Sequence, residues 1–368
     1  MAVLVVKIGT SSLVGPDGVL RDEVLRARVA EIVRVRRQGH RPVLVTSGAI
    51  ACGLGRLGIT ERPTALPDLQ AASAVGQGVL FQRYLEVFGD HGIVPAQVLL
   101  TSADLERRAS YLNARATLSR LLDLGVVPVV NENDTTATDE LTFGDNDVLA
   151  AHVAVLLRAT WLVLLTDRDG LYVRGADGGP ELLGDVPAGV SPEDVDLYTM
   201  PNSTTGRGGI ASKIASASMA TAAGVTCVIA SGARDGVVSG VAHGRHVGTR
   251  FQPAPGTASA FKLWLTYAKP AMGRVHVDAG AARALRMLGT SLLPVGVTGC
   301  DGAFAAGDAV EVAENGGGIV GKGIATLSAD ELRQVAGLKS AEVRRLLPDA
   351  QDEVVHRDQF VLLPGDAA

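Results

Sequence analysis

The stretch that decides the fold reads VVPVV at residues 126–130, NENDTTATDELTFGDND at residues 131–147 and VLAAHVAVLL at residues 148–157. Its first part is a short apolar run typical of a buried strand, and its third part is a longer apolar run that favours a helix. The middle part is therefore expected to be a long polar loop at the carboxyl end of a strand. Open α/β sheets bind their ligands at this edge.

The polar loop concentrates acids and carboxamides, which are Asn131, Glu132, Asn133, Asp134, Asp139, Glu140, Asp145, Asn146 and Asp147. Such a group can accept hydrogen bonds from a ligand's ammonium, orient lysines, or lie near a metal ion carried by a nucleotide. A solvated acidic loop is the simpler interpretation of a generic Asp and Asn cluster. Two lysines elsewhere in the chain favour a binding site instead.

Apolar runs of strand length and of helix length alternate on both sides of this loop. The expected strands span residues 3–8, 42–45, 93–100, 126–130, 161–165 and 225–230. The expected helices span residues 22–38, 68–88, 111–124, 148–157 and 214–223. This alternation predicts a mostly parallel sheet covered by helices on both faces and joined by right-handed crossovers. Strand 225–230 is expected to be the last one of this domain.

Two lysines and one serine stand at turns that could receive an anion. Lys7 lies near the end of the first strand, before the small polar turn 9–12, where its ammonium could reach a phosphate; an ordinary exposed strand lysine is equally compatible. Ser47 and Gly48 follow strand 42–45, where backbone N–H groups and a hydroxyl can bind a carboxylate or phosphate. Lys213 closes the glycine-rich turn 206–213, a possible phosphate cradle before a helix.

Two glycine motifs match known fingerprints in letters only. Gly53-x-Gly55-x-x-Gly58 comes too late after its strand and has no acid-tipped strand behind it, so we interpret it as a glycine-rich helix and turn and reject a nicotinamide cofactor. The segment 316–322 resembles a P-loop, but Gly323 replaces the required Ser or Thr and the surroundings favour a hairpin.

The length and composition indicate a globular α/β protein of two domains. A chain of 368 residues exceeds what one hydrophobic core usually organises. Hydrophobic residues make up 47% of the chain and aromatic residues 4%, with 44 glycines, which suits a compact enzyme with many tight turns. The N-terminus lacks the pattern of a signal peptide, and no run of about eighteen apolar residues predicts a membrane span, so we expect a cytoplasmic protein.

The cysteines and histidines predict neither a disulfide framework nor a metal site. Cys52, Cys227 and Cys300 are odd in number and far apart, which fits buried thiols in a reducing compartment. His243 and His246 are the one close histidine pair, and a surface turn is the favoured interpretation.

The C-terminal part has a different character. Beyond the Pro- and Gly-containing stretch 252–259, short β-type runs at 274–277, 309–312 and 319–324 alternate with glycine turns, which predicts a small barrel-like β domain with one or two helices. From Val275 onward, 8 Lys and Arg face 13 Asp and Glu, so this part accounts for the net charge of -5. Such a balance argues against a nucleic-acid partner.

Six segments, taken in their order and spacing, closely resemble the amino-acid kinase family. They are Lys7 to Ser11, Val45 to Ala51, Asn131 to Asp134, Gly144 to Asp147, Leu165 to Asp167 and Gly208 to Lys213. The stretch from Gly273 to about Val355 resembles the PUA domain that many members carry. The resemblance implies an amino-acid kinase domain at residues 1–258, with a mostly parallel sheet between helices, and a small β-barrel-like PUA domain at residues 259–368.

The resemblance also implies a reaction. It is closest to members that phosphorylate the side-chain carboxylate of L-glutamate to L-glutamyl 5-phosphate, the first step of proline biosynthesis. ATP, arriving with Mg²⁺, is the implied phosphoryl donor. Feedback inhibition by proline, a homo-oligomer (dimer or tetramer) and a working partnership with glutamate-5-semialdehyde dehydrogenase are implied as well.

The matching motifs carry roles over to individual residues. Lys7 and Lys213 are expected to be catalytic charges on the transferring phosphoryl group, held in position by Asp147. The expected substrate-binding residues are Ser47, Gly48, Asp134 and Asn146. The expected ATP-binding residues are Lys7, Thr166, Asp167, Arg207, Gly208, Gly209, Ile210, Ala211, Ser212 and Lys213. No protein ligand is assigned to Mg²⁺, and Arg207 departs from the family's usual Gly-Thr-Gly-Gly-Met, so it could contact phosphate or solvent.

Two other interpretations compete with this one. Kinases of N-acetylglutamate, aspartate and uridylate share the two lysines and differ in the acceptor pocket, where the motif Asn131 to Asp134 favours free glutamate. PUA domains elsewhere bind RNA, but the acidic C-terminal part lacks an interleaved basic and aromatic stripe.

Overall fold

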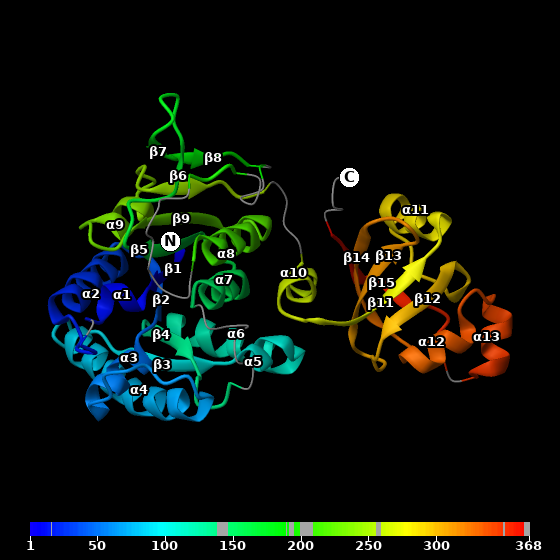
Figure 1. The fold of residues 1–368 in the computed structure, drawn as a ribbon, viewed down its shortest axis with the longest axis horizontal. Coiled ribbons are helices and arrows are strands. Elements are labelled where there is room, and N and C mark those ends of the chain that lie inside the picture. The colour runs from blue at the N-terminus through cyan, green and yellow to red at the C-terminus, as the bar shows by residue number, and fades with distance from the viewer. Residues whose placement is uncertain are drawn as a thin grey trace. The chain divides into compact units, whose positions relative to one another are not determined.

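The computed structural model describes residues 1–363 apart from residues 16, 138–145, 189, 191–194, 199–208, 255–258 and 349. The chain divides into two compact units, Met1–Thr257 and Ala258–Ala368, and each is described by itself. Figure 1 shows both units, with the colour running along the chain from blue at the N-terminus to red at the C-terminus.

The first unit is built on a sheet with the strand order β3-β4-β2-β1-β5-β9-β10-β8. The strands are β1 (Val3–Ile8), β2 (Arg41–Thr46), β3 (Pro95–Leu100), β4 (Val127–Glu132), β5 (Trp161–Thr166), β8 (Asp185–Val186), β9 (Thr226–Ser231) and β10 (Thr249–Phe251). Neighbours from β3 to β9 all pair in parallel. The expected mostly parallel sheet is confirmed, and the carboxyl ends of β1, β2, β4, β5 and β9 therefore meet at one edge.

Helices cover both faces of this sheet. They are α1 (Thr10–Leu13), α2 (Asp22–Arg37), α3 (Ala49–Leu57), α4 (Leu66–Gly89), α5 (Ser102–Glu106), α6 (Arg108–Asp123), α7 (Asn146–Leu157), α8 (Ile210–Ala222) and α9 (Val237–Ala242). Apolar side chains of α2, α4 and α9 share one core with the strands. Figure 1 shows α2 and α9 on one side of the sheet and α7 and α8 on the other. Because α7 packs against β1, β5, α6 and α8, nearly all its side chains are buried.

Several boundaries differ from the expectations. Strand 225–230 is not the last strand of the unit, because β10 pairs with β9 in antiparallel fashion and with β8 in parallel. β10 has three residues and α9 six, which is too short for a periodic apolar pattern to show in the sequence. The turn at 9–12 contains the one-turn helix α1. A separate antiparallel hairpin follows β5, formed by β6 (Tyr172–Arg174) and β7 (Pro180–Leu182).

The glycine-rich segment after β2 is a helix, as expected, and its glycines serve helix packing. Gly58 ends α3 with φ +70°. A Cβ on Gly53 would lie 1.7 Å from the Ala72 carbonyl oxygen, and one on Gly76 would lie 1.8 Å from the Ala49 carbonyl oxygen. Only glycine lets the backbones of α3 and α4 approach so closely, and this contact places α4 beside the turn that follows β2.

The second unit contains a sheet with the strand order β12-β11-β13-β14-β15. Its strands are β11 (Ala271–Val277), β12 (Val297–Gly302), β13 (Ala309–Glu314), β14 (Ile319–Ala325) and β15 (Val355–Leu362). Its helices are α10 (Ala260–Tyr267), α11 (Ala279–Leu288), the short 3-10 helix η2 (Pro294–Gly296), α12 (Ala329–Val335) and α13 (Ser340–Leu346). The small β domain is confirmed, but the expected one or two helices are too few, because helices of seven to ten residues leave little periodic signal.

The two remaining sequence motifs have structural explanations. Residues 316–322 belong to the antiparallel β13–β14 hairpin, so the P-loop is absent there. His246 binds Asp185 with 3.0 Å between Nδ1 and Oδ2, and His243 Nδ1 contacts the Ser239 carbonyl oxygen of its own helix. Among the helices that the structure describes, none combines the length and apolar character needed to span a membrane.

Candidate active site

Three charged side chains meet at the carboxyl edge of the sheet of the first unit. Asp147, in the first turn of α7, has a side chain with 0% exposure. The Lys7 Nζ of β1 lies 2.7 Å from its Oδ1, and the Lys213 Nζ of α8 lies 2.9 Å from its Oδ2. Both lysines are themselves mostly buried, with side-chain exposures of 8% and 14%. One carboxylate thus holds two ammonium groups that come from opposite ends of the unit's sequence.

The two lysines set the charge state of Asp147. Burial alone would raise the pKa of this carboxyl, but the charges and hydrogen bonds of Lys7 and Lys213 outweigh burial and lower the pKa below its usual value. The carboxylate is therefore ionised at neutral pH, and the cluster of three residues carries one net positive charge. An anionic ligand is the natural complement of such a buried cationic cluster.

A polar cluster lies beside these charges, at the turn after β2. Asn146 Nδ2 donates to the Thr46 carbonyl oxygen and to Ser47 Oγ, each at 2.7 Å, and to Asn131 Oδ1 at 2.9 Å. Gly48 precedes α3 with φ +107°, a conformation that glycine adopts without strain. This geometry places the Ser47 hydroxyl and the first N–H groups of α3 toward the same edge.

The two acids of the motif Asn131 to Asp134 have unusual pKa values. Burial raises the pKa of Asp134, and the hydrogen bond from Ser73 and the charge of Arg62 offset only part of this rise. Ser73 Oγ donates to Asp134 Oδ2 at 2.7 Å. Burial, followed by the charge of Asp134, raises the pKa of Glu132 to about 7. Acids perturbed in this way are frequent at functional sites.

The residues expected to bind ATP lie at the same edge where the structure describes them. Thr166 ends β5, between β1 and β9, and its Oγ1 donates to Asp167 Oδ1 at 3.0 Å. Gly209 precedes α8, whose first turn holds Ile210, Ala211, Ser212 and Lys213. Ser212 Oγ is buried without a hydrogen-bond partner among the described residues, so it is available to a ligand. Arg207 and Gly208 lie outside the described residues, as do the loop acids Asp139, Glu140 and Asp145.

The helix that supports this cluster, α4, contains none of the family motifs. Three side chains of α4 hold the motif and the residues after it, namely Gln70, Ser73 and Gln77. Their spacing of three and four residues would place them on one face of a helix, and that polar stripe is the signal that could have revealed them. Asn131 joins Gln77 to Asn146, whereas its place in the polar loop and in the motif Asn131 to Asp134 predicted no role for its own side chain.

Comparison with known proteins places this arrangement in a family. The family model described as "Amino acid kinase family" matches residues 2–231. The chain belongs to the amino acid kinase family. A model of the PUA domain matches residues 273–347. As an amino acid kinase with a C-terminal PUA domain, the protein has the architecture that its sequence motifs implied.

Relatives with the same architecture are similar along almost their whole length. The chain is 46% identical over 364 residues to the glutamate 5-kinase of Synechococcus sp. (strain JA-3-3Ab), covering 98% of each chain. It is 46% identical over 370 residues to the glutamate 5-kinase of Gloeobacter violaceus, covering 99% of this chain and 100% of the relative. It is 44% identical over 362 residues to the glutamate 5-kinase of Moorella thermoacetica, covering 98% and 96%.

Proposed function

We propose that this amino acid kinase transfers the γ-phosphoryl group of ATP to the side-chain carboxylate of L-glutamate, giving L-glutamyl 5-phosphate and ADP. The observation that carries the proposal is the buried Lys7–Asp147–Lys213 cluster beside the polar Ser47 and Asn146 cluster. The glutamate 5-kinases that the chain resembles from end to end support the choice of acceptor. Residues 1–258 form the kinase domain in this proposal, and residues 259–368 form the PUA-like domain.

The reaction needs charge neutralisation rather than a general base. A glutamate side chain has a pKa of about 4.3 and is already ionised at neutral pH, so the acceptor is itself an anion. The site must bring this anion in line with a triphosphate and stabilise charge that spreads over the phosphoryl oxygens. Lys7 and Lys213 supply the two positive charges, and Asp147 keeps their ammonium groups together before the phosphates arrive.

The acceptor pocket presents groups of both polarities. Ser47 Oγ accepts from Asn146, so its own proton is available to a substrate carboxylate, together with the N–H groups after Gly48. Asp134 provides a carboxylate for the α-ammonium group. Asn146 Oδ1 is buried and has no hydrogen-bond partner among the described residues, so it is a second acceptor for that ammonium.

The nucleotide lies in this proposal against the end of β5 and the start of α8. Thr166, Asp167 and the segment from Arg207 to Lys213 are the residues that would hold ATP. Both oxygens of Asp147 are engaged by ammonium groups, so this carboxylate does not suit a metal ion. Mg²⁺ would be held through the phosphates and water, and would neutralise charge on the β- and γ-phosphates.

The product and the pocket have consequences for the pathway. An acyl phosphate is labile in water, so a reductase such as glutamate-5-semialdehyde dehydrogenase would take it up in proline biosynthesis. Proline carries the same α-carboxylate and a cationic nitrogen, so it would compete for the glutamate pocket. A cytoplasmic homo-oligomer of two or four chains completes the proposal.

The decisive experiment measures ADP release with Mg-ATP and L-glutamate, N-acetyl-L-glutamate, L-aspartate or UMP. Hydroxylamine is included to trap an acyl phosphate as its hydroxamate. ADP that depends on glutamate, with a matching amount of hydroxamate, is the expected result. ADP release with another acceptor and none with glutamate would overturn the assignment of the substrate. An initial rate at limiting glutamate that proline leaves unchanged would count against inhibition.

A further inference from the structure

The acceptor pocket is held by one face of a single helix. Along α4, Gln70 Nε2 donates to the Ala137 carbonyl oxygen at 3.0 Å, Ser73 Oγ donates to Asp134 Oδ2 at 2.7 Å, and Gln77 Oε1 accepts from Asn131 Nδ2 at 2.7 Å. One further residue of the helix, the fully buried Tyr84, shares a hydrogen bond of 2.9 Å with Thr46 Oγ1. The helix therefore contacts the end of β2 at Thr46 and the segment 131–137 after β4.

The orientation of the amides in this pocket follows from one backbone carbonyl. The Thr46 carbonyl oxygen can only accept, so the Asn146 atom 2.7 Å away must be the donor Nδ2. The same NH₂ group faces Asn131 at 2.9 Å, so Asn131 must present its oxygen there. Asn131 then has its NH₂ group on the far side, facing Gln77. An amide turned the other way would bring two donors or two acceptors together.

Gln77 is the last member of this relay, and it must present an acceptor. Its Oε1 lies 2.7 Å from Asn131 Nδ2, while no described residue pairs with its Nε2. The relay leaves Asn146 Oδ1 buried and unpartnered among the described residues. A change at Gln77 would therefore alter how Asn146 Oδ1 is presented to a ligand's ammonium group, although Gln77 reaches Asn146 only through Asn131.

We propose that Gln77 is a positioning residue for the acceptor: its side-chain carbonyl orients Asn131, and through Asn131 it holds Asn146 with Oδ1 toward the substrate ammonium group. This inference rests on the proposed function and names the part of the fold that gives the pocket its polarity. Without an acceptor at position 77, the Asn131 amide keeps its hydrogen bond to Asn146 but loses the one on its far side, so Asn131 is held at one end only and supports Asn146 less firmly.

The test compares Gln77→Leu with Gln77→Glu. Glutamate at position 77 keeps the acceptor, and leucine removes it while filling a similar volume. We expect Gln77→Leu to raise the KM for L-glutamate about tenfold, the size of one lost hydrogen bond to a buried amide, with the KM for ATP unchanged. The KM of Gln77→Glu for L-glutamate is expected to remain within about threefold of that of the unchanged protein. A residue that only packs would give the opposite order, because leucine suits a half-buried helix position better than a carboxylate.

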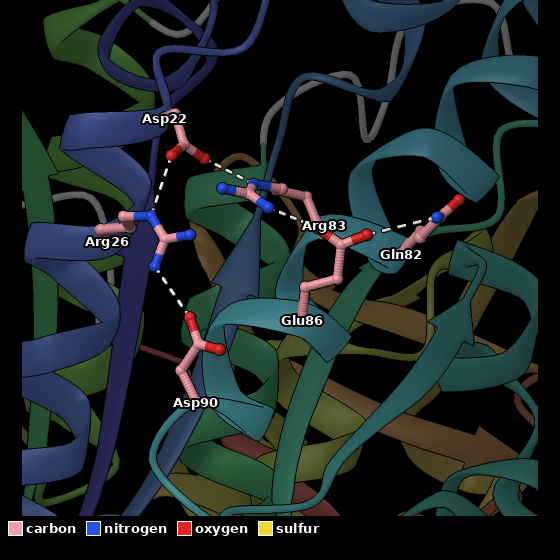
Figure 2. Close-up of polar contacts among 6 residues, drawn as sticks. All are labelled: Asp22, Arg26, Gln82, Arg83, Glu86 and Asp90. Atoms are coloured by element: carbon pink, nitrogen blue, oxygen red, sulfur yellow. Dashed lines mark hydrogen bonds and ion pairs between the residues drawn. The ribbon is translucent and has the colours of Figure 1, made fainter.

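A matched control lies on the same helix. Gln82 is exposed and donates to Glu86 of its own helix at 3.3 Å, as Figure 2 shows, so Gln82→Leu makes the same replacement outside the relay. It is expected to leave both KM values unchanged. Equal KM values for glutamate in Gln77→Leu and in the unchanged protein would overturn the positioning role while leaving the glutamate kinase assignment intact.

A readout without turnover separates the two proposals. In protein labelled with ¹⁵N at asparagine, the side-chain NH₂ signal of Asn131 is identified by its loss in Asn131→Asp. We expect this signal to shift and to exchange faster with solvent in Gln77→Leu, and to be retained in Gln77→Glu and Gln82→Leu. An unchanged Asn131 signal in Gln77→Leu would disprove the relay whatever acceptor the enzyme uses.

Discussion

Asp147 is a fully buried carboxylate whose oxygens each meet one ammonium group, and this pairing explains how two lysines can share a small space. Without it, the repulsion between two buried cations would push one of them out or remove its proton. The depressed pKa of Asp147 keeps the pair intact across the neutral range. In the proposed reaction the phosphoryl oxygens would share these two charges, which are already in position.

Replacing Lys213 by alanine removes one of the two charges and tests the catalytic role directly. We expect turnover to fall on the order of a hundredfold or more, because a positioned charge in a site that excludes water stabilises a transition state by a few kcal/mol. Lys262→Ala, at an exposed position of α10, is the control and should leave turnover unchanged. Steady-state ADP release measures both. Undiminished turnover in Lys213→Ala would disprove the assignment.

The raised pKa of Glu132 predicts that the free energy of unfolding depends on pH. Its pKa of about 7 in the folded state lies above the ordinary 4.5, so the folded chain binds more protons between these values. The free energy of unfolding is therefore expected to fall as pH rises through this window. Glu132→Gln stays neutral and should lose the effect, leaving the variant more stable than the unchanged protein by about 1–3 kcal/mol at pH 7.5 and nearly equal at pH 5.

Tryptophan fluorescence can follow this change in the first unit alone. The chain has two tryptophans, Trp161 in β5 and Trp264 in α10, so a Trp264→Phe background leaves a reporter only in the first unit. Urea unfolding at pH 5 and pH 7.5 then gives the free energies. If the free energies of unfolding of Glu132→Gln and of the unchanged protein changed equally between pH 5 and pH 7.5, burial would not raise the pKa of Glu132.

At the scale of elements, α4 has three faces with three tasks. One face holds the proposed acceptor pocket through Gln70, Ser73 and Gln77. A second face meets α3 at Gly76 in backbone contact. On a third face, Arg83 pairs with Asp22 of α2, and Arg26 of α2 pairs with Asp22 and with Asp90 just after α4, as Figure 2 shows. Exposed ion pairs of this kind add little stability, so the backbone contact with α3 and the apolar core shared with the strands fix the position of α4.

The close contact between α3 and α4 gives a test with an internal control. A Cβ on Gly76 would lie 1.8 Å from the Ala49 carbonyl oxygen, so Gly76→Ala must push the helices apart and should lower the free energy of unfolding by about 1–3 kcal/mol. Gly78, two residues further, has nothing within 4 Å of an added Cβ. Gly78→Ala should therefore raise the free energy of unfolding by about 0.5–1 kcal/mol. Urea unfolding followed by Trp161 fluorescence measures both. Equal stability of the two variants would contradict the close packing.

Sequence patterns predicted the long elements and missed what depends on packing. The strand 3–8 coincides with β1, and the helix 22–38 differs from α2 by one residue, because each has a long run of one period. The residues alone left Lys7 open between a catalytic and an exposed lysine, and only the family resemblance joined it to Asp147 and Lys213. The proposed role of Gln77 depends on its contact with Asn131, which lies 54 residues further along the chain, and no local pattern encodes such a contact.

At the scale of the whole molecule, function and charge are divided between two units. The hydrophobic core of the first unit draws on residues 4–241, and that of the second unit on residues 275–360. All proposed site residues lie between Lys7 and Lys213, within the first unit. The excess of acidic residues lies after Val275, within the second unit. Each unit therefore has the apolar core that independent folding requires.

Two fragments test whether this division is complete. Residues 259–368 alone are expected to unfold in one cooperative transition followed by Trp264, because Val275, Val312 and Leu332 of their core are fully buried within the unit. Residues 1–258 alone are expected to keep hydroxamate formation from L-glutamate, because every group assigned to the reaction is present. Val312→Ala in the full chain opens a cavity in the second core only. It should lower the urea midpoint of the unfolding transition followed by Trp264 fluorescence and leave the KM for glutamate unchanged. A fragment 1–258 that folds but forms no hydroxamate would show that the acidic second unit contributes to the kinase site.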